Sequence, residues 1–575
     1  MKKYIIISFI TGFILIGCSE LNLDPLSQGS RENWYSNDTE ISVSLNELYD
    51  VKYWENWYKP YSTGWINWID AWSDDFTGRN FLSLLPGGTI SGVSSATIVE
   101  WQNTYKCIAA ANLIIEGIDR AKYELPEKNI NKYLGDAKFV RAAQYSKLIF
   151  LYGDVPFFTK TLDIKEAFTL SRTNKEVILA EIYNDFDFAI SHLPVSYGDN
   201  ELTHATKGAA LAMKARIALY MEDWDVARDA AKACIDLGVY ELYPDFSEFF
   251  GKKNTVETVF AIPRSTQFNS WIKIEQIVNR NTGGYSTVQP SWDVFCSFLC
   301  TDGLPIDESP LFNPREPFQN RDPRCAATIV EFGTYHLGVM YQPHPDSLKV
   351  WDQHNGVYKA NNDSRGVNIL ASYNGLVWKK WLEDGWYTSN RGDMPNIVIR
   401  YADVLLIYAE AKIELEEIDQ SVLDAINKVR ARAYKVSYTE TSSYPAVTST
   451  DQSELRKTLR IERRMEFVFE GGLGTSLRFA DLIRWKLAEK ALTKKDYGML
   501  DPADIRKKVV NPGLWFFPEI PEIDEDGIPD FESMYSKGLI KILTIRAFDK
   551  SRNYLLPIPT KEILINSNLT QNPNY

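Results

Sequence analysis

The sequence has few of the residues from which metal sites are most often built. It contains 5 histidines and 6 cysteines in 575 residues. The histidines are scattered and form no HExxH or similar pair, which argues against a histidine-built metal site. A calcium site made of carboxylates alone would leave no such pattern. No cofactor is therefore expected, and structural calcium stays open.

The cysteines give no sign of a disulfide framework. Five of them lie in the body of the chain: Cys107, Cys234, Cys296, Cys300 and Cys325. An odd number without framework spacing predicts mostly buried free thiols. Cys296 and Cys300 could share one face of a helix, but they make a poor zinc site because no histidine stands at ligand spacing.

The sequence also lacks a basic block. Acidic residues outnumber basic ones, 76 to 63, and the formal net charge is −13. A nucleic-acid-binding surface needs clustered Lys and Arg to displace counterions from phosphates, whereas Lys252-Lys253 and Arg463-Arg464 are only pairs. We therefore expect no nucleic-acid partner. The hydrophobic content of 45% with 24% charged residues is typical of a folded protein.

One long apolar run is present, at the N-terminus. Lys2 and Lys3 precede the apolar segment 4–16, which is the pattern of a secretion signal and is shorter than the about 20 residues of a membrane-spanning helix. The residues Leu15-Ile16-Gly17-Cys18 resemble the lipobox of bacterial lipoproteins, in which cleavage leaves the cysteine as an acylated N-terminus. We predict a signal peptide at 1–17, a lipidated Cys18, a tether over 18–36 and one domain over 37–575.

Helical periodicity dominates much of the remaining chain. A first helix is expected from Asp38-Thr39 to about Val51. Further amphipathic segments are 101–118, 135–152, 174–193, 207–221, 224–237, 397–415 and 421–434. From 135–152 onward they form antiparallel pairs like tetratricopeptide repeats, although the copies are too widely spaced for a regular solenoid.

The predicted fold is thus mostly α, with paired helices forming a superhelical scaffold over about 37–237 and 395–490. The segments of about 238–394 and 436–453 are rich in Gly, Pro, Asn and aromatic residues, and we expect loop-rich, irregular structure with a short strand at 258–262. A C-terminal segment, 491–575, follows. Loops on a helical scaffold are where ligand contacts usually lie.

Five stretches, spread over nearly the whole chain, resemble the SusD/RagB family of outer-membrane nutrient-binding lipoproteins. They are WQNTYKCIAAANLII from Trp101, FVRAAQYSKLIFLYGDVPFF from Phe139, RYADVLLIYAEAKIEL from Arg400, IERRMEFVFEGGLGTSLRFADLIRW from Ile461, and the terminal YLLPIPTKEILINSNLTQNPNY. Each stretch alone is a weak match to the family, but the five stretches in this order are specific for it. One departure is the link between Glu470 and Asp481, which is longer than usual for the family and leaves the local loop geometry open.

The resemblance implies a cell-surface protein, held in the outer membrane by its lipid, that caps a SusC-like TonB-dependent transporter. Such proteins help to deliver oligosaccharides or, in some members, peptides, and they are not enzymes. The charged residues of the motifs are expected to be structural ion-pair and capping residues, because buried charges persist only when they are paired. They are Arg141, Arg400, Asp403, Glu462, Arg463, Arg464 and Asp481.

Ligand contacts are expected from two loop regions. Ser73-Asp74-Asp75 resembles the end of the family's early helical region, and the loop beyond it commonly reaches the binding face; the second region is 270–292. A sugar ring stacks its C–H face on an aromatic ring, while Arg and Asn bond its hydroxyls. The predicted ligand-binding residues are Trp65, Arg79, Asn80, Phe81, Trp271 and Tyr285. Other tryptophans near Trp65, at helical spacing from Trp54 to Trp72, are better explained by core packing.

Three other functions remain open at this point. A surface glycosidase would need two carboxyl groups placed across a cleft, and no hydrolase motif is recognisable. Capture of peptides or another nutrient would use the same residue types as glycan capture. A purely structural surface protein would have the transporter as its only partner.

Overall fold

The computed structural model describes residues 34–35, 37–55, 72–79, 84–121, 125–198, 204–268, 270–383, 385, 389, 391–472 and 475–575. The predicted signal peptide, Cys18 and all of the tether except Trp34 and Tyr35 lie outside these residues. So do three of the predicted ligand-binding residues, Trp65, Asn80 and Phe81. The described part begins with the buried ring of Tyr35, which lies against Gly117.

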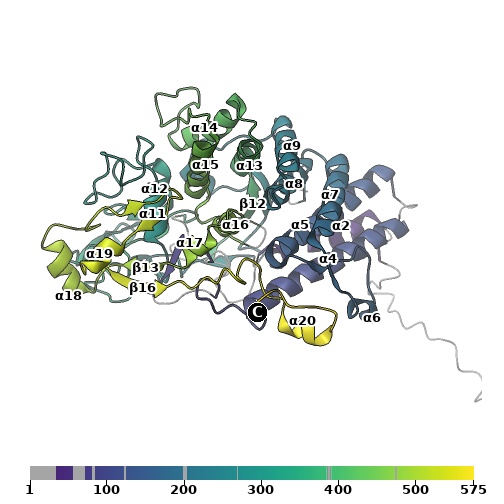
Figure 1. Cartoon of the computed structure of the whole chain (residues 1–575), viewed down its shortest axis with the longest axis horizontal. Coiled ribbons are helices and arrows are strands. Elements are labelled where there is room, and N and C mark those ends of the chain that lie inside the picture. Colours follow the sequence, from purple (N-terminus) through teal and green to yellow (C-terminus); the bar gives the residue numbers. More distant parts are fainter. Residues whose placement is uncertain are drawn as a thin grey trace, which may run out of the picture.

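One half of the molecule is built from paired helices, at the right and top of Figure 1. These helices are α2 (Asp38–Glu47), α3 (Val51–Trp54), α4 (Ser95–Ala121), α5 (Glu127–Tyr152), α6 (Ile164–Ala167), α7 (Lys175–His192), α8 (Lys207–Tyr220), α9 (Trp224–Asp236), α13 (Tyr401–Glu414) and α14 (Gln420–Ala433). The predicted partners pack together: α5 on α7, α8 on α9, and α13 on α14. The mostly α-helical fold and its helix pairs are confirmed.

Several predicted helix starts need correction. The helices predicted at 101–118 and 135–152 begin earlier, at Ser95 in α4 and at Glu127 in α5. The first helix begins at Asp38 but its N-cap is Asn37, whose side chain accepts a hydrogen bond from the Glu40 amide, and the helix ends at Glu47. The segment 397–400 is not helical. It belongs to strand β12 (Asn396–Arg400), which pairs antiparallel with β4 (Thr258–Ile262), the strand predicted at 258–262. The β-branched run Ile397-Val398-Ile399 suits a buried strand, so α13 begins only at Tyr401.

The other half, at the left of Figure 1, contains short elements joined by loops. Its helices are α10 (Phe246–Phe249), α11 (Trp292–Ser297), α12 (Pro323–Thr328), α17 (Ala488–Leu492), α18 (Pro502–Ile505) and α19 (Glu532–Ser536). Its strands include β1 (Phe76–Gly78), β5 (Ile272–Lys273), β6 (Val288–Pro290), β7 (Tyr335–His336), β8 (Val339–Met340), β9 (Lys349–Asp352), β10 (Val357–Ala360), β11 (Arg391–Gly392), β13 (Lys495–Gly498) and β16 (Lys541–Ile545). The only larger sheet among the described residues has four strands, β10-β9-β8-β7.

The five cysteines of the body are buried and free, as predicted. Cys300 does not share a helix with Cys296, because α11 ends at Ser297 and Cys300 instead forms a β-bridge with Arg321. Within the described part of the chain, no group of His, Cys, Asp and Glu side chains is arranged to hold a metal ion.

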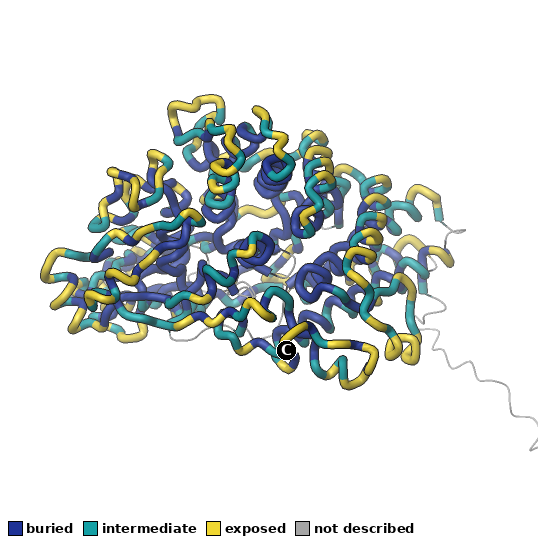
Figure 2. Tube along the Cα trace, viewed as in Figure 1, coloured by how far each residue is buried: buried dark blue, intermediate teal, exposed yellow. Residues whose placement is uncertain are grey.

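Buried ion pairs around α15 (Gln452–Phe467) and α16 (Leu477–Arg484) join the two halves. Arg400 contacts Glu257, Glu466 and Glu470 at 2.6–2.7 Å, and Arg463 contacts Asp403 and Asp481 at 2.9 and 3.0 Å. All seven charged motif residues are buried and paired, so their structural role is confirmed. Figure 2 shows these central segments in dark blue, while exposed residues gather on outer turns and loops.

Candidate functional site

The first predicted loop region is anchored by two buried carboxylates. Asp74 accepts hydrogen bonds from Arg464 at 2.9 Å and from Arg478 at 2.8 Å, and Asp75 accepts from Arg464 at 3.0 Å. The two arginines hold the pKa of Asp74 well below its usual range against the opposing effect of burial. Helices α15 and α16 thereby fix the start of β1, three residues before Arg79.

Arg79 and Tyr285 are brought together by the pairing of β1 with β6. The antiparallel register places Gly78 opposite Val288, and the Arg79 amide donates to the Thr287 carbonyl at 3.2 Å. The Arg79 guanidinium in turn donates to the carbonyl of Tyr285. The Tyr285 side chain is 45% exposed. Two of the predicted ligand-binding residues thus lie on one surface.

The loop that carries Tyr285 has a fixed shape. Asp363 accepts hydrogen bonds from the Asn279 side chain at 2.6 Å and from the Arg280 amide at 2.7 Å. Burial raises the pKa of Asp363 to about 6 although these bonds favour its ionised form. A Cβ on Gly284 would stand 2.1 Å from the Val278 carbonyl oxygen, so this close approach requires glycine.

Tyr373 is the centre of a cationic cluster beside this loop. The guanidinium carbons of Arg365 and Arg79 lie 4.4 and 5.9 Å from its ring centroid, and the Lys541 ammonium lies 5.4 Å away. Arg280 interacts electrostatically with Tyr373 and Tyr285, and its Nε donates to the Leu370 carbonyl at 2.6 Å. We call Arg79, Arg280, Tyr285 and Tyr373 the Arg79 surface.

Trp271, the other described candidate, has a different neighbour. It precedes β5, which pairs with β11, and its ring is covered by the guanidinium of Arg391 at 4.3 Å. No contact between Trp271 and the Arg79 surface is present among the described residues. Arg280 and Tyr373 are additions that sequence reasoning missed. Arg280 stands inside the segment 270–292 and could have been chosen by residue type, whereas nothing in the sequence near Tyr373 distinguishes it.

The tryptophan-rich segment contributes to the core where it is described. Trp54 and Trp72 are both buried, Trp54 against Phe139 and Phe260, and Trp72 against Phe479. The core prediction is confirmed for these two, and Trp57, Tyr61, Trp65 and Trp68 lie outside the described residues.

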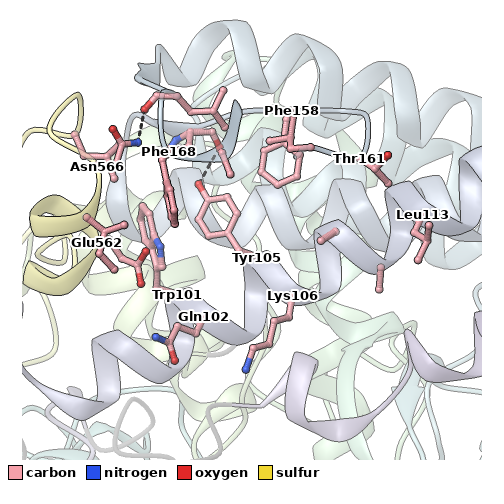
Figure 3. Close-up of a pocket in the computed structure, with 18 residues that line it drawn as sticks. Trp101, Gln102, Tyr105, Lys106, Leu113, Phe158, Thr161, Phe168, Glu562 and Asn566 are labelled. Carbon is pink, nitrogen blue, oxygen red and sulfur yellow. Dashed lines mark hydrogen bonds between the residues drawn. The ribbon is translucent and has the colours of Figure 1, made fainter. Parts of the chain in front are cut away.

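A separate groove of about 780 Å³ lies between α4, the loop around α6, and α20 (Thr560–Ile565) (Figure 3). Its aromatic rings pack on one another: Trp101 lies 4.8 Å from Tyr105, and Tyr105 stacks with Phe158 at 6.1 Å. The hydroxyl of Tyr105 already donates to the Pro156 carbonyl at 2.8 Å. The groove therefore combines packed aromatic rings with the polar side chains of Gln102, Lys106 and Glu562 at its lining.

Loops held by a rigid helical scaffold are a usual place for functional residues, and here they present aromatic and cationic side chains. Comparison with known proteins identifies the family to which this chain belongs. Residues 257–575 match the model described as the SusD family, and residues 84–219 match the one described as "Starch-binding associating with outer membrane". The chain belongs to the SusD family. No described helix has the length and apolar character needed to cross a membrane.

Relatives match over almost the full length. A SusD-like protein of Formosa agariphila is 24% identical over 606 aligned positions that cover 100% of both chains. The crystal structure of a SusD-like carbohydrate-binding protein from Bacteroides fragilis is 25% identical, with a TM-score of 0.75 over 93% of this chain and 99% of that one. A laminarin-binding SusD-like protein shares the fold at 19% identity, with a TM-score of 0.58 over 94% of this chain and 100% of that one.

Proposed function

We propose that this protein is a cell-surface lipoprotein that binds an oligosaccharide or polysaccharide and delivers it to a SusC-like TonB-dependent transporter in the outer membrane. The observation that carries the proposal is the meeting of Arg79 with the exposed Tyr285 on a fixed loop surface. Family membership, and the carbohydrate binding for which the Bacteroides fragilis relative is named, support the ligand class. The transporter and the lipid anchor rest on the family and on the lipobox-like sequence at Cys18.

The surface has the groups that a sugar needs. The Tyr285 ring offers an apolar face for the C–H side of a pyranose, and guanidinium N–H groups donate to ring hydroxyls. Because the loop is held by Asp363 and by Gly284, its binding groups lose little conformational freedom when the ligand arrives. Binding without chemical change is the expected role, and Trp65, Asn80, Phe81 and Trp271 stay predicted contributors.

The first test is retardation of the purified protein in native gels that contain a panel of polysaccharides, with and without calcium. Tyr285→Ala should weaken binding of the retarding glycan about tenfold, since loss of an aromatic contact costs about 1 kcal/mol or more. The melting temperature should stay unchanged because the ring is nearly half exposed. Phe168→Ala, at a 50% exposed ring in the groove, is the matched control and should bind normally.

The same gels distinguish the competing functions. Sugars released from a retarding polysaccharide would identify a glycosidase and contradict the binding role. Retardation by no glycan, together with binding of a peptide mixture, would move the ligand class to peptides. Equal loss of binding in Tyr285→Ala and Phe168→Ala would remove the Arg79 surface as the site.

A further inference from the structure

The Arg79 surface is positively charged in a protein that is acidic overall. Arg79, Arg280, Arg365 and Lys541 surround Tyr373, and the carboxylates among them are Asp363 and Asp501. Four positive and two negative groups leave a local charge of +2, against −13 for the whole chain. The excess of positive charge is therefore a local feature that the overall composition does not predict.

The two carboxylates are already committed to other groups. Asp501 is shared by Arg365 at 2.8 Å and Lys541 at 2.7 Å. Asp363 is buried and accepts hydrogen bonds from the side chain of Asn279 and from the Arg280 and Asn281 amides. Neither makes a salt bridge to the guanidinium of Arg79 or of Arg280.

No salt bridge to Arg79 or Arg280 is present among the described residues, although Asp363 attracts the Arg280 guanidinium electrostatically. Their polar contacts are backbone carbonyls: Tyr285 and Ser286 for Arg79, and Leu370 for Arg280. Arg79 Nε has no hydrogen-bond partner there at all. Partial burial and the neighbouring charge of Arg280 both lower the pKa of Arg79. Most buried arginines in the described part of the chain pair with carboxylates, although the buried Arg321 also bonds only to backbone carbonyls.

Two neighbouring guanidinium groups that make no salt bridge match an anion with several oxygens. Carboxylates and sulfate-like groups accept paired hydrogen bonds from the planar fork of arginine, and such charge-assisted bonds are about twice as strong as neutral ones. A bound anion would also relieve the repulsion between Arg79 and Arg280. The exposed ring of Tyr285, next to these arginines, supplies a face on which the sugar ring that bears the anion can stack.

We propose, resting on the glycan-binding function above, that the ligand is an acidic polysaccharide whose carboxylate or sulfate-ester group is bound between Arg79 and Arg280 while its sugar ring packs on Tyr285. Both sources of negative charge share this chemistry. The ligand class is then narrower than carbohydrate in general, and neutral glucans are excluded as preferred ligands.

The test is calorimetric titration of the purified protein with two matched pairs of probes. Polygalacturonate and its fully methyl-esterified form report on carboxylates, and a sulfated carrageenan and its desulfated form report on sulfate esters. One charged probe should bind at least about tenfold more tightly than its neutral counterpart. Its affinity should fall as sodium chloride is raised, because salt screens exposed charges. The pair that shows the difference identifies the anion.

The variants Arg79→Gln and Arg280→Gln should each lower the affinity for the charged probe about tenfold and reduce its salt dependence, with little effect on the neutral counterpart. Arg79 also holds the Tyr285 loop, so Arg79→Gln could misfold. In that case the affinity of Arg280→Gln for the charged probe provides the test. Lys165→Gln is the charge-matched control, since this exposed lysine lies on α6, at the far end of the helical half in Figure 1.

The outcomes separate the two proposals. If a neutral glycan binds through Tyr285 and neither charged probe exceeds its counterpart, the acidic-ligand inference is overturned and the glycan-binding function stands. Equal losses in Lys165→Gln and the arginine variants would show a general charge effect and also overturn the inference. If no glycan of either kind binds, both proposals fail together.

Discussion

At the scale of single residues, His336 shows how burial couples charge to folding. The side chain is 4% exposed, and its Nε2 has no hydrogen-bond partner in the described part of the chain. Burial, helped by the positive charge of Lys379, lowers the pKa of His336 to about 3, compared with 6.5 for a free imidazole. Between these values the unfolded chain binds a proton that the folded protein does not bind.

The free energy of unfolding should therefore fall as the pH is lowered from about 6.5, at a rate of up to about 1.4 kcal/mol per pH unit from this one group. The stabilising effect of a neutral His336 is complete above 6.5. In His336→Phe the pH slope between 6.5 and 4 should be smaller by about one bound proton, measured by urea unfolding at several pH values. Equal slopes in wild type and His336→Phe would refute the coupling.

Residue type and sequence position predict only part of the site. Arg79 and Tyr285 were chosen because they follow recognisable sequence landmarks. Their contact spans 206 positions and depends on the register of β1 with β6, which neither segment encodes by itself. Tyr373 lies in a loop without periodicity, so only the folded chain reveals that Arg79, Arg280, Arg365 and Lys541 surround it.

At the scale of elements, helices were more predictable than strands. Ile178, Ile182 and Phe186 repeat every four residues, and all three are buried in α7 against α5. In β12 the run Ile397-Val398-Ile399 fits either a buried helix or a buried strand, and the pairing with β4 decides between them. Tertiary pairing, rather than local preference, sets such a boundary.

Strand β1 depends on α15 and α16 for its position, and this dependence can be measured. Asp74→Asn would leave Arg464 and Arg478 buried with much less compensating charge, and removing one partner of a buried pair typically costs about 3–5 kcal/mol. We expect a lower urea midpoint, and weaker glycan binding because Arg79 loses its support.

The control for this variant is Asp187→Asn, which breaks a partly exposed pair with Lys214 and should cost less than about 1 kcal/mol. Unchanged stability in Asp74→Asn would mean that the buried carboxylate does not hold β1. Unchanged stability with weakened binding would mean that Asp74 positions the loop without supporting the fold.

At the scale of the whole molecule, the proposed lipid anchor at Cys18 can be tested directly. Replacing Cys18 by alanine should abolish incorporation of radiolabelled palmitate and release the protein from the membrane fraction, since stable anchoring needs more than one acyl chain. The isolated Cys18→Ala protein should retain glycan binding, measured in the native gels. Palmitate labelling that persists without Cys18 would contradict the predicted lipidation site.

The ion pairs around α15 also determine when, during synthesis, the chain can complete its fold. The buried ion-pair partners of Asp74, Asp75, Arg216 and Glu257 lie at positions 400–478, far later in the sequence. A polypeptide synthesised from its N-terminus has none of these partners until most of it has been made. Other buried pairs, such as Arg141–Asp185 and Lys147–Glu100, can form within the early half alone. The buried charges at the centre of the fold are therefore neutralised only when the segment from Arg400 to Arg478 is present.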